Sequence, residues 1–344
     1  MKQTAIFFSR PEKIELRETV LPMPGPGQIL VNTLFSAISP GTELMIYRGL
    51  APDDLSVDET IHGLKGKFAF PLKYGYSAVG VVAAVGKGIS PEWEGRTVFS
   101  FHPHESCFLS GLQEIQQIPQ GIAPEAALFF PAMETAVNLL MDGGPLIGER
   151  VIVFGQGIIG LLTTALLARY PISRLLAIDR FPLRRQYSQK LGAHVCLDPD
   201  ARDAILEFLS CNAGRDGNYK ADLIYELSGN PAALDEAITL AGFHARIVIG
   251  SWYGTIPASL HLGSRFHRDR IKLISSQVST IDPSLRGQWD KQRRADLVWK
   301  MIKLVNPLEL ITHRFPLVKA SEAYDLLDQS PEESIQIIFT YPMA

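Results

Sequence analysis

The stretch RVIVFGQGIIGLLTTALLARYP, residues 150–171, constrains the fold of this chain more than any other segment. It reads as a wholly apolar strand, a glycine turn and an apolar helix. Apolar strands continue to alternate with helical segments for about a hundred further residues. Strands that are apolar on both faces and alternate with helices are typical of a parallel sheet covered by helices on both sides. The sequence therefore predicts an α/β fold with a doubly wound parallel sheet.

The glycines of this turn have the G-x-G-x-x-G spacing of a dinucleotide-binding loop. Gly155 allows a tight turn, Gly157 lets the backbone approach a pyrophosphate, and Gly160 lets the helix pack on the strand. The helix that begins at Ile158 and Ile159 offers unpaired N–H groups and a positive dipole end to the phosphates. We therefore expect a Rossmann domain that binds a dinucleotide; the alternative is a glycine turn that binds no ligand.

An acidic residue follows the next predicted strand at the spacing expected for ribose recognition. Asp179 ends the strand RLLAIDR, about 20 residues after the glycines. Its carboxylate would accept hydrogen bonds from the adenosine ribose hydroxyls and would repel a 2′-phosphate, which favours NAD as the cofactor. Arg180 and Arg184 keep NADP open as the alternative, because a rotated Arg180 could pair with a 2′-phosphate.

The two ends of the chain are predicted to form a second, β-rich domain. Residues 1–117 contain short apolar runs separated by proline and glycine, which is typical of a compact, partly open barrel. The apolar strand at 334–342 needs a sheet to join, and the first domain is the expected host. We therefore assign 1–117 and 284–344 to one domain and 118–283 to the Rossmann domain, whose last strand is expected at SSQVS, residues 275–279.

Composition narrows the class of partner. A formal net charge of −3 gives no long-range attraction to nucleic acid or to an anionic membrane, so a small-molecule substrate is expected. The three cysteines, Cys107, Cys196 and Cys211, contain no CxxC pair, which argues against a structural zinc lobe and fits a reducing cytoplasm. No signal-peptide pattern and no run of about 18 apolar residues is present, so a cytoplasmic protein is expected.

Three further motifs carry a resemblance that extends over essentially the whole chain. AISPGTELMIYRG (37–49), YGYSAVGVVAAVG (74–86) and GQGIIG (155–160) occur in the order found in the medium-chain dehydrogenase/reductase superfamily. The chain most resembles the zinc-lacking subgroup that contains the bacteriochlorophyllide hydroxyethyl dehydrogenase. The resemblance implies a GroES-like catalytic domain beside the Rossmann domain, hydride transfer to a nicotinamide, and a homodimer.

The same resemblance indicates which residues replace the catalytic zinc ligands. Zinc-containing members use two cysteines, a histidine and a glutamate. The corresponding positions here are Ser39 or Pro40, Tyr76, Ser77 and Pro131. Because none of these supplies a thiolate, an imidazole or a carboxylate, the set cannot hold zinc tightly, and no metal site is expected.

Hydroxyl groups are the expected substitutes for the ion. The resemblance places Thr42 at the hydroxyl-bearing position of the proton relay and Tyr76 at a former ligand position. One of them is expected to hydrogen-bond the reacting oxygen; alternatively, Tyr76 only fills the former metal cavity. The resemblance also implies that Thr135 faces the nicotinamide. Ser228 and Gly250 follow later strands, at the carboxyl edge of the sheet where ligands bind.

A second cluster of chemically active residues lies in FSFHPHESCF, residues 99–108. On an extended strand, His102 and His104 would share one face, while Glu105 and Cys107 would share the other. A metal site is therefore disfavoured. His104 is a candidate acid or base, or lines the substrate site; the alternative is a surface or hydrogen-bonded core histidine.

Together these residues predict a zinc-independent oxidoreductase. It would transfer hydride between NAD(H) and a secondary alcohol or ketone of a small molecule, cyclic molecules included. One alternative is a quinone or enoyl reductase that uses NAD(P)H, because reduction of a conjugated C=C bond needs no metal. Another is a non-catalytic dinucleotide-binding protein.

Overall fold

The computed structural model describes residues 1–58, 61–64, 66–210 and 220–342. Cys211 lies outside these ranges. The chain divides into two compact units, each described by itself below. The terminal unit comprises Met1–Pro131 and Ile302–Ala344, and the central unit comprises Ala132–Met301. Among the described residues, no helix combines the length and the apolar character needed to cross a membrane.

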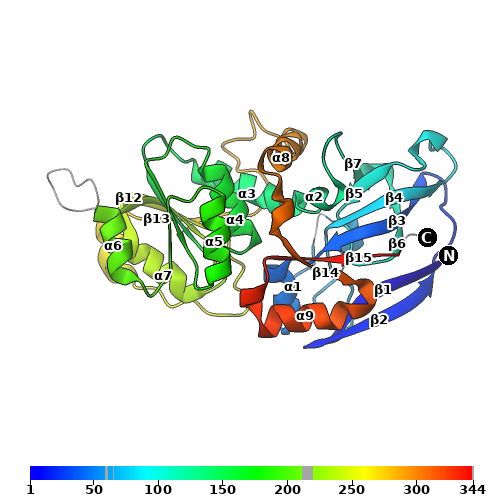
Figure 1. The fold of residues 1–344 in the computed structure, drawn as a ribbon, viewed down its shortest axis with the longest axis horizontal. Helices are drawn as coiled ribbons and strands as arrows, with labels where there is room; N and C mark the ends of the chain where they lie inside the picture. The colour runs from blue at the N-terminus through cyan, green and yellow to red at the C-terminus, as the bar shows by residue number, and fades with distance from the viewer. Residues whose placement is uncertain (59–60, 65, 211–219, 343–344) are drawn as a thin grey trace. The chain divides into compact units, whose positions relative to one another are not determined.

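The central unit contains one six-stranded sheet, in which every neighbouring pair of strands is parallel. Its strands are β8 (Arg150–Phe154), β9 (Arg174–Ile178), β10 (Val195–Leu197), β11 (Ala221–Glu226), β12 (Ala241–Ile249) and β13 (Lys272–Ser275). Its helices are α3 (Phe130–Gly143), α4 (Ile158–Leu167), α5 (Pro182–Lys190), α6 (Arg202–Ser210), α7 (Pro231–Leu240) and most of α8 (Lys291–Val305). Figure 1 shows these strands alternating with helices in the green and yellow part of the ribbon.

The strand order of this sheet is β10-β9-β8-β11-β12-β13. Counted from β8, this is the order 3-2-1-4-5-6 of the doubly wound dinucleotide-binding fold. Successive residues of β8 point to opposite faces: Ile152 belongs to one apolar core, whereas Val151 and Val153 belong to another. Both faces of the strand are therefore buried, which explains why Val151–Phe154 are all apolar.

The terminal unit is built around a seven-stranded sheet and a separate hairpin. The sheet contains β14 (Ile311–Pro316), β15 (Gln336–Thr340), β3 (Gln28–Ala37), β4 (Ala78–Val85), β5 (Thr97–Ser100) and β7 (Ile115–Gln117), with β6 (Cys107–Gly111) paired to β3. The hairpin is formed by β1 (Lys2–Arg10) and β2 (Lys13–Val20), and the helices are α1 (Pro40–Tyr47), α2 (Pro124–Ala127) and α9 (Ala320–Gln329).

The two ends of the chain meet in this sheet, because β15 pairs antiparallel with β3 and parallel with β14. Helices α1 and α9 contact each other (Figure 1). They share an apolar core that includes Phe8, Tyr47 and Tyr324. The terminal segment therefore contributes both a strand and a helix to the unit that begins at residue 1.

The last strand of the central sheet differs from the prediction. It covers Lys272–Ser275, whereas residues 276–279 of the predicted strand SSQVS are not in a strand. The partner strand β12 ends at Ile249, which is paired with Ser275. The Ser276 N–H still donates to the Ile249 carbonyl oxygen at 3.0 Å, but β12 itself ends at Ile249, so the regular pairing stops there.

Candidate functional site

The three glycines of the predicted dinucleotide loop each meet a different steric requirement. Gly155 follows β8 with φ of +82°, a conformation that favours glycine. A Cβ on Gly160 would lie 1.8 Å from the Gly155 carbonyl oxygen, so the helix could not approach the loop so closely with any larger residue. A Cβ on Gly157 would meet only the Arg184 Nη1 atom, at 4.0 Å, so space is open above this residue.

The start of α4 completes the loop. Gly157 is the N-cap residue of α4 and makes no side-chain cap, so the helix begins at Ile158 directly beside the open space. The first N–H groups of a helix have no partner within the helix and carry its positive dipole end. Open space above a glycine and unpaired N–H groups suit a pyrophosphate, so the residues present fit a dinucleotide. Gly155, Gly157, Ile158, Ile159 and Gly160 would hold its phosphates.

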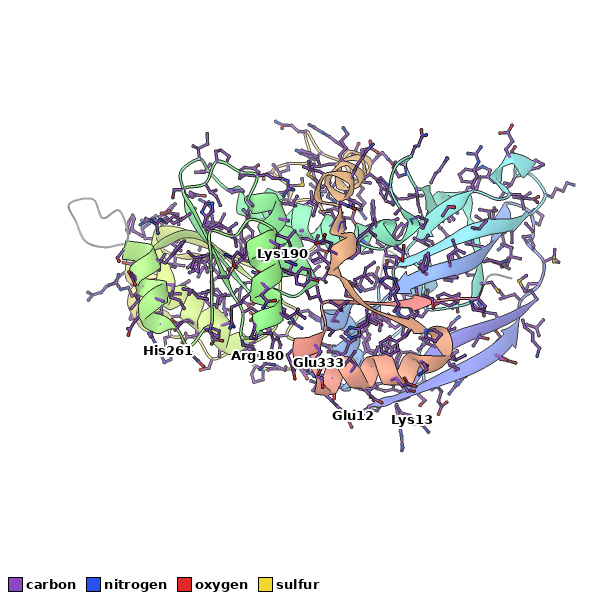
Figure 2. All side chains as sticks on the ribbon, in the orientation of Figure 1. Glu12, Lys13, Arg180, Lys190, His261 and Glu333 are labelled. Carbon is purple, nitrogen blue, oxygen red and sulfur yellow. The ribbon has the colours of Figure 1, made fainter. Side chains whose placement is uncertain are left out.

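Asp179 is tied directly to this loop. Its carboxylate is 7% exposed, and it accepts hydrogen bonds from the backbone N–H of Gln156 at 2.7 Å and of Phe181 at 2.8 Å. Each carboxylate oxygen keeps further lone pairs for a ribose hydroxyl. The guanidinium groups of Arg180 and Arg184 lie 4.5 and 4.7 Å from the Phe181 ring centre. Figure 2 shows Arg180 at the outside of the central unit.

Two other predicted cofactor residues lie beside the same loop or near it. The Cα of Ser228 lies 2.5 Å from the position of a Cβ on Gly155, so the strand ends of β8 and β11 are in close contact. The Gly250 N–H donates to the Glu226 carbonyl oxygen at 3.0 Å. The loop, Ser228 and Gly250 thus occupy the carboxyl ends of adjacent parallel strands. Thr135 lies on α3, in the same unit.

A buried carboxylate at this edge was missed by the sequence reasoning. Glu226 is 0% exposed and accepts hydrogen bonds from the Ser228 N–H and hydroxyl and from the Tyr253 hydroxyl. Burial, and then the charge and hydrogen bond of Glu226, raise the pKa of Tyr253. An acidic residue after the apolar run LIY, at the end of the strand ADLIYE, was the available signal. This pair fixes the segment after β12 to the end of β11.

In the terminal unit, the structure brings together three hydroxyl groups, which we call the hydroxyl cluster: Ser39, Thr42 and Tyr76. The Tyr76 hydroxyl contacts the Ser39 Oγ and lies 3.5 Å from the Thr42 Oγ1. Ser39 is the N-cap residue of α1 and Thr42 lies in its first turn, whereas Tyr76 lies two residues before β4. The two candidates predicted for the reacting oxygen, Tyr76 and Thr42, therefore lie side by side.

The Tyr76 ring and the Tyr76 hydroxyl have different surroundings. The ring packs against the apolar core of the terminal unit, and the hydroxyl is held by Ser39 and Thr42. Burial raises the pKa of the Tyr76 phenol, against the opposing effect of the two hydrogen bonds. Tyr76 is therefore a neutral phenol at pH 7, with an oriented hydroxyl.

The remaining positions aligned with zinc ligands offer no additional donor set. The Ser77 hydroxyl donates to the Leu128 carbonyl oxygen at 2.7 Å, and Pro131 has no ligating side chain. Within the described ranges, no group of three or more histidine, cysteine, aspartate or glutamate residues could hold a metal ion. Alcohol and phenol oxygens without a thiolate, imidazole or carboxylate do not fit a tight zinc site.

The arrangement predicted for the histidine segment is wrong. Strand β6 begins only at Cys107, and the preceding chain bends, so the alternation of faces along an extended strand does not apply to residues 102–106. The His102 Nε2 atom lies 2.8 Å from the Glu105 Oε2 atom, and Lys73 contacts the other Glu105 oxygen. Burial alone would raise the pKa of Glu105, but His102 and Lys73 together lower it.

His104 lies in a buried polar network. Its side chain is 0% exposed, with Nδ1 2.7 Å from the Ser36 Oγ and Nε2 3.1 Å from the Glu43 Oε2. Tyr324 also contacts Glu43, and Tyr341 lies 2.7 Å from the Ser36 Oγ. Sequence reasoning did not identify the two tyrosines of this network. Tyr324 lies on α9 and Tyr341 just after β15, and no local motif marks them.

Comparison with known proteins shows that the chain is similar to dehydrogenases in part of its sequence and in its fold. Residues 159–291 match the family model described as zinc-binding dehydrogenase. Over 98% of its length, the chain superposes with a TM-score of 0.78 on 99% of the short chain alcohol dehydrogenase RspB of Escherichia coli CFT073 in complex with NADH, at 20% identity. It also superposes with a TM-score of 0.76 on a structure from Sinorhizobium meliloti 1021 bound to NADP, at 18% identity and 99% coverage of each chain.

Two curated relatives are similar along most of their length. The D-guloside 3-dehydrogenase of Escherichia coli K12 is 23% identical, covering 91% of this chain and 93% of the relative. The 2-desacetyl-2-hydroxyethyl bacteriochlorophyllide A dehydrogenase of Rhodobacter capsulatus is 27% identical, covering 96% of each chain. The structural matches confirm the predicted fold class. The sequence matches confirm the prediction of a dehydrogenase-type oxidoreductase.

Proposed function

We propose that this protein is a zinc-independent oxidoreductase that transfers hydride between NAD(H) and a secondary alcohol or ketone of a small molecule, cyclic molecules included. The observation that carries the proposal is the hydroxyl cluster. Ser39 and Tyr76 stand where the resemblance puts zinc ligands, and Thr42 stands where it puts the proton relay. The cluster therefore offers hydrogen-bonding hydroxyls in place of a metal-binding set. The relatives named above as dehydrogenases of a guloside and of a hydroxyethyl group support an alcohol substrate.

The bound dinucleotide would supply the hydride donor or acceptor. The chain's own contribution is to bind the substrate oxygen and to handle its proton. A neutral Tyr76 phenol can donate its hydrogen to a carbonyl oxygen, while Ser39 and Thr42 donate theirs to the Tyr76 oxygen. This chain of hydroxyls polarises the phenol and stabilises negative charge that develops on the substrate oxygen.

Removing single hydroxyl groups tests the proposal. Tyr76→Phe and Thr42→Val should each leave dinucleotide affinity unchanged, because neither residue belongs to the glycine loop. Turnover should fall by roughly 100-fold or more in Tyr76→Phe, as expected when a positioned proton donor is lost. The Ser77→Ala variant is a matched control, since its hydroxyl is bonded to Leu128 and not to the cluster. Wild-type rates in both cluster variants would reject the proposal.

Assays with several substrate classes separate this function from its rivals. Reduction of NAD by secondary alcohols supports the proposed reaction. Oxidation of NAD(P)H by a quinone or an enone, without activity on alcohols, would indicate the alternative reductase. With an enone, Tyr76 would then protonate the α-carbon after hydride has added at the β-carbon. Tight dinucleotide binding without turnover of any compound would indicate a non-catalytic binding protein.

We also propose NAD in preference to NADP, no catalytic zinc, and a homodimer. Asp179, held rigidly by Gln156 and Phe181, supports NAD, while the exposed Arg180 is the residue that would favour NADP. Titration calorimetry with both nucleotides decides the first point. Metal analysis of the purified protein decides the second, and a stoichiometric bound divalent ion would overturn it. Sedimentation equilibrium measures the oligomeric state.

A further inference from the structure

The buried network around Glu43 is directly connected to the hydroxyl cluster. Glu43 is 0% exposed, and its Oε1 atom accepts a hydrogen bond of 2.6 Å from the backbone N–H of Ser39. Its Oε2 atom is 3.1 Å from the His104 Nε2 and also contacts the Tyr324 hydroxyl. A carboxylate buried to this degree is costly unless donors surround it, and here three donors do so.

One arrangement of hydrogens fits this network. The His104 Nε2 donates to the Glu43 side chain, because a carboxylate can only accept. The His104 Nδ1 atom then accepts from the Ser36 hydroxyl, which in turn accepts from Tyr341. Every polar group in the chain from Tyr341 to Glu43 is then satisfied. An acid or base that exchanges protons with substrate would need a free, accessible nitrogen, and His104 has neither free nitrogen nor exposure.

The N-terminus of α1 explains what Glu43 does for Ser39. A serine at the N-cap position ordinarily bonds its hydroxyl to an N–H of the first helical turn. Ser39 makes no such bond, and its hydroxyl contacts Tyr76 instead. The Glu43 side chain reaches back to the Ser39 N–H and fixes the residue from its backbone side. The serine hydroxyl is thereby available to Tyr76 rather than used as a cap.

His104 holds the other side of the same contact. Its ring lies against Gly75, which has φ of +115°, and a Cβ on Gly75 would be 2.7 Å from the His104 Cδ2 atom. The His104 N–H also donates to the Tyr74 carbonyl oxygen at 3.3 Å. The residues immediately before Tyr76 therefore rest on His104, while the partner of Tyr76, Ser39, is held by Glu43.

We propose that Glu43 and His104 act as a positioning pair: their buried contact fixes Ser39 on one side and the Gly75–Tyr76 backbone on the other, and so sets the direction of the Tyr76 hydroxyl. This inference rests on the proposed function of the hydroxyl cluster and assigns His104 an indirect role in place of direct acid–base chemistry. Tyr324 and Ser36 complete the pair by satisfying Glu43 and His104.

The test uses the full-length protein with 13C-labelled tyrosine rings and measures both turnover and the Tyr76 signal. Glu43→Gln removes the charge while keeping the side-chain size, and Tyr324→Phe removes one donor to Glu43. Both should shift the Tyr76 resonance and lower kcat, by about 10-fold up to the ~100-fold that a 1 Å displacement can cause. Dinucleotide affinity should be unchanged in both. If Glu43→Gln does not fold, Tyr324→Phe decides alone.

Tyr47→Phe is the matched control. Tyr47 belongs to the same apolar core, stacks on Tyr324 with ring centres 5.7 Å apart, and donates its hydroxyl to Asp325 at 3.0 Å. The substitution removes the hydrogen bond from the Tyr47 hydroxyl to Asp325 and leaves the hydrogen bonds of Glu43 in place. The control should therefore keep wild-type kcat and an unshifted Tyr76 signal, even if its thermal stability falls as much as that of Tyr324→Phe.

A double-mutant cycle distinguishes positioning from a general structural effect. If Glu43 acts through Ser39, Glu43→Gln should lower kcat little further in a Ser39→Ala background. Full additivity, or an unshifted Tyr76 resonance in both Glu43→Gln and Tyr324→Phe, would overturn the inference. Wild-type turnover in Tyr76→Phe would instead reject the proposed function. The Tyr76 resonance in Glu43→Gln and Tyr324→Phe would still report on the positioning pair.

Discussion

The dinucleotide loop and the hydroxyl cluster are built from different parts of the chain. The loop is local: its glycines lie within six residues, and its hydrogen bonds join backbone groups of Gly155 and Gln156 to Ile178 and Asp179. The hydroxyl cluster depends on side chains from α1, the segment before β4, the bend before β6, α9 and the segment after β15. One site is specified by backbone conformation, the other by tertiary packing.

This difference determines which substitutions each site tolerates. A site made of backbone groups keeps its donors whatever side chains it carries, provided that the backbone can still adopt its conformation. A site made of buried side chains loses a partner with each substitution, and an unsatisfied buried polar group costs about 1–3 kcal/mol. The loop should therefore be sensitive at its glycines, and the cluster at many distant residues.

The largest effect is expected from a matched pair of glycine substitutions. Gly160→Ala places a methyl group 1.8 Å from the Gly155 carbonyl oxygen, so the helix must move and dinucleotide binding should be lost. Gly157→Ala places its methyl group in open space, where only a ligand would be met. It should fold normally and still bind dinucleotide at least tenfold more weakly. Calorimetric titration and thermal unfolding of both variants measure this.

The two glycine variants have different consequences if they bind dinucleotide like the wild type. Unchanged affinity in Gly157→Ala would mean that no phosphate approaches this residue, and that the dinucleotide does not bind over this loop. Unchanged affinity in Gly160→Ala would mean that the loop can shift without loss, contrary to a site specified by backbone geometry.

The same distinction explains how far the sequence could predict each site. Gly155, Gly157, Gly160 and Asp179 could be identified because their spacing records a local backbone requirement, and the structure shows steric reasons for Gly155 and Gly160. Tyr76 and Thr42 were selected as candidates for the same site only through resemblance to known dehydrogenases. Local spacing alone would not have joined residues 34 positions apart.

The Glu43 network could not be predicted, because its bonds span the whole chain. Tyr324 is 281 residues from Glu43, and Tyr341 is 305 residues from Ser36. The bend at residues 102–106 was missed for a related reason. A run of alternating residues suggests a strand, but ladder partners decide where a strand begins, and β3 pairs with β6 only from Cys107 onward.

A second prediction tests whether the central unit relies on backbone groups alone. Arg294 is 1% exposed and donates to the Asn138 Oδ1 at 2.6 Å, to the Glu134 Oε1 at 3.0 Å and to the Val278 carbonyl oxygen at 2.7 Å. Arg294→Met leaves Glu134 buried without its cation, so the free energy of unfolding should fall by about 3–5 kcal/mol. Denaturant titration measures this loss.

Arg293→Met is the control for this substitution. Arg293 is exposed and lies over the Trp289 ring at 4.0 Å, so its loss should change stability by about 0.5 kcal/mol or less. Equal stability of the two variants would show that the Arg294 network contributes little. The central unit would then depend less on buried polar side chains, relative to the terminal unit, than the structure suggests.

The smallest expected effect is a pair of opposite pH dependences, one from each unit. In the terminal unit, His102 and Lys73 outweigh burial and lower the pKa of Glu105, so its stabilisation is present above its unfolded pKa and disappears as pH falls. In the central unit, burial outweighs Arg294 and raises the pKa of Glu134, so its stabilisation is present at acid pH and disappears as pH rises.

Two isosteric variants measure these opposite slopes. The stability deficit of Glu105→Gln relative to the wild type should shrink between pH 6 and pH 4, whereas that of Glu134→Gln should grow. Each change should be on the order of 1 kcal/mol, since one pKa unit corresponds to about 1.4 kcal/mol. Denaturant midpoints at several pH values give both slopes, with the wild type as the common reference. Slopes of the same sign would mean that one carboxylate is not held as the structure shows. The sign of the Glu105 slope is the more informative, because only its His102 and Lys73 contacts can overcome burial.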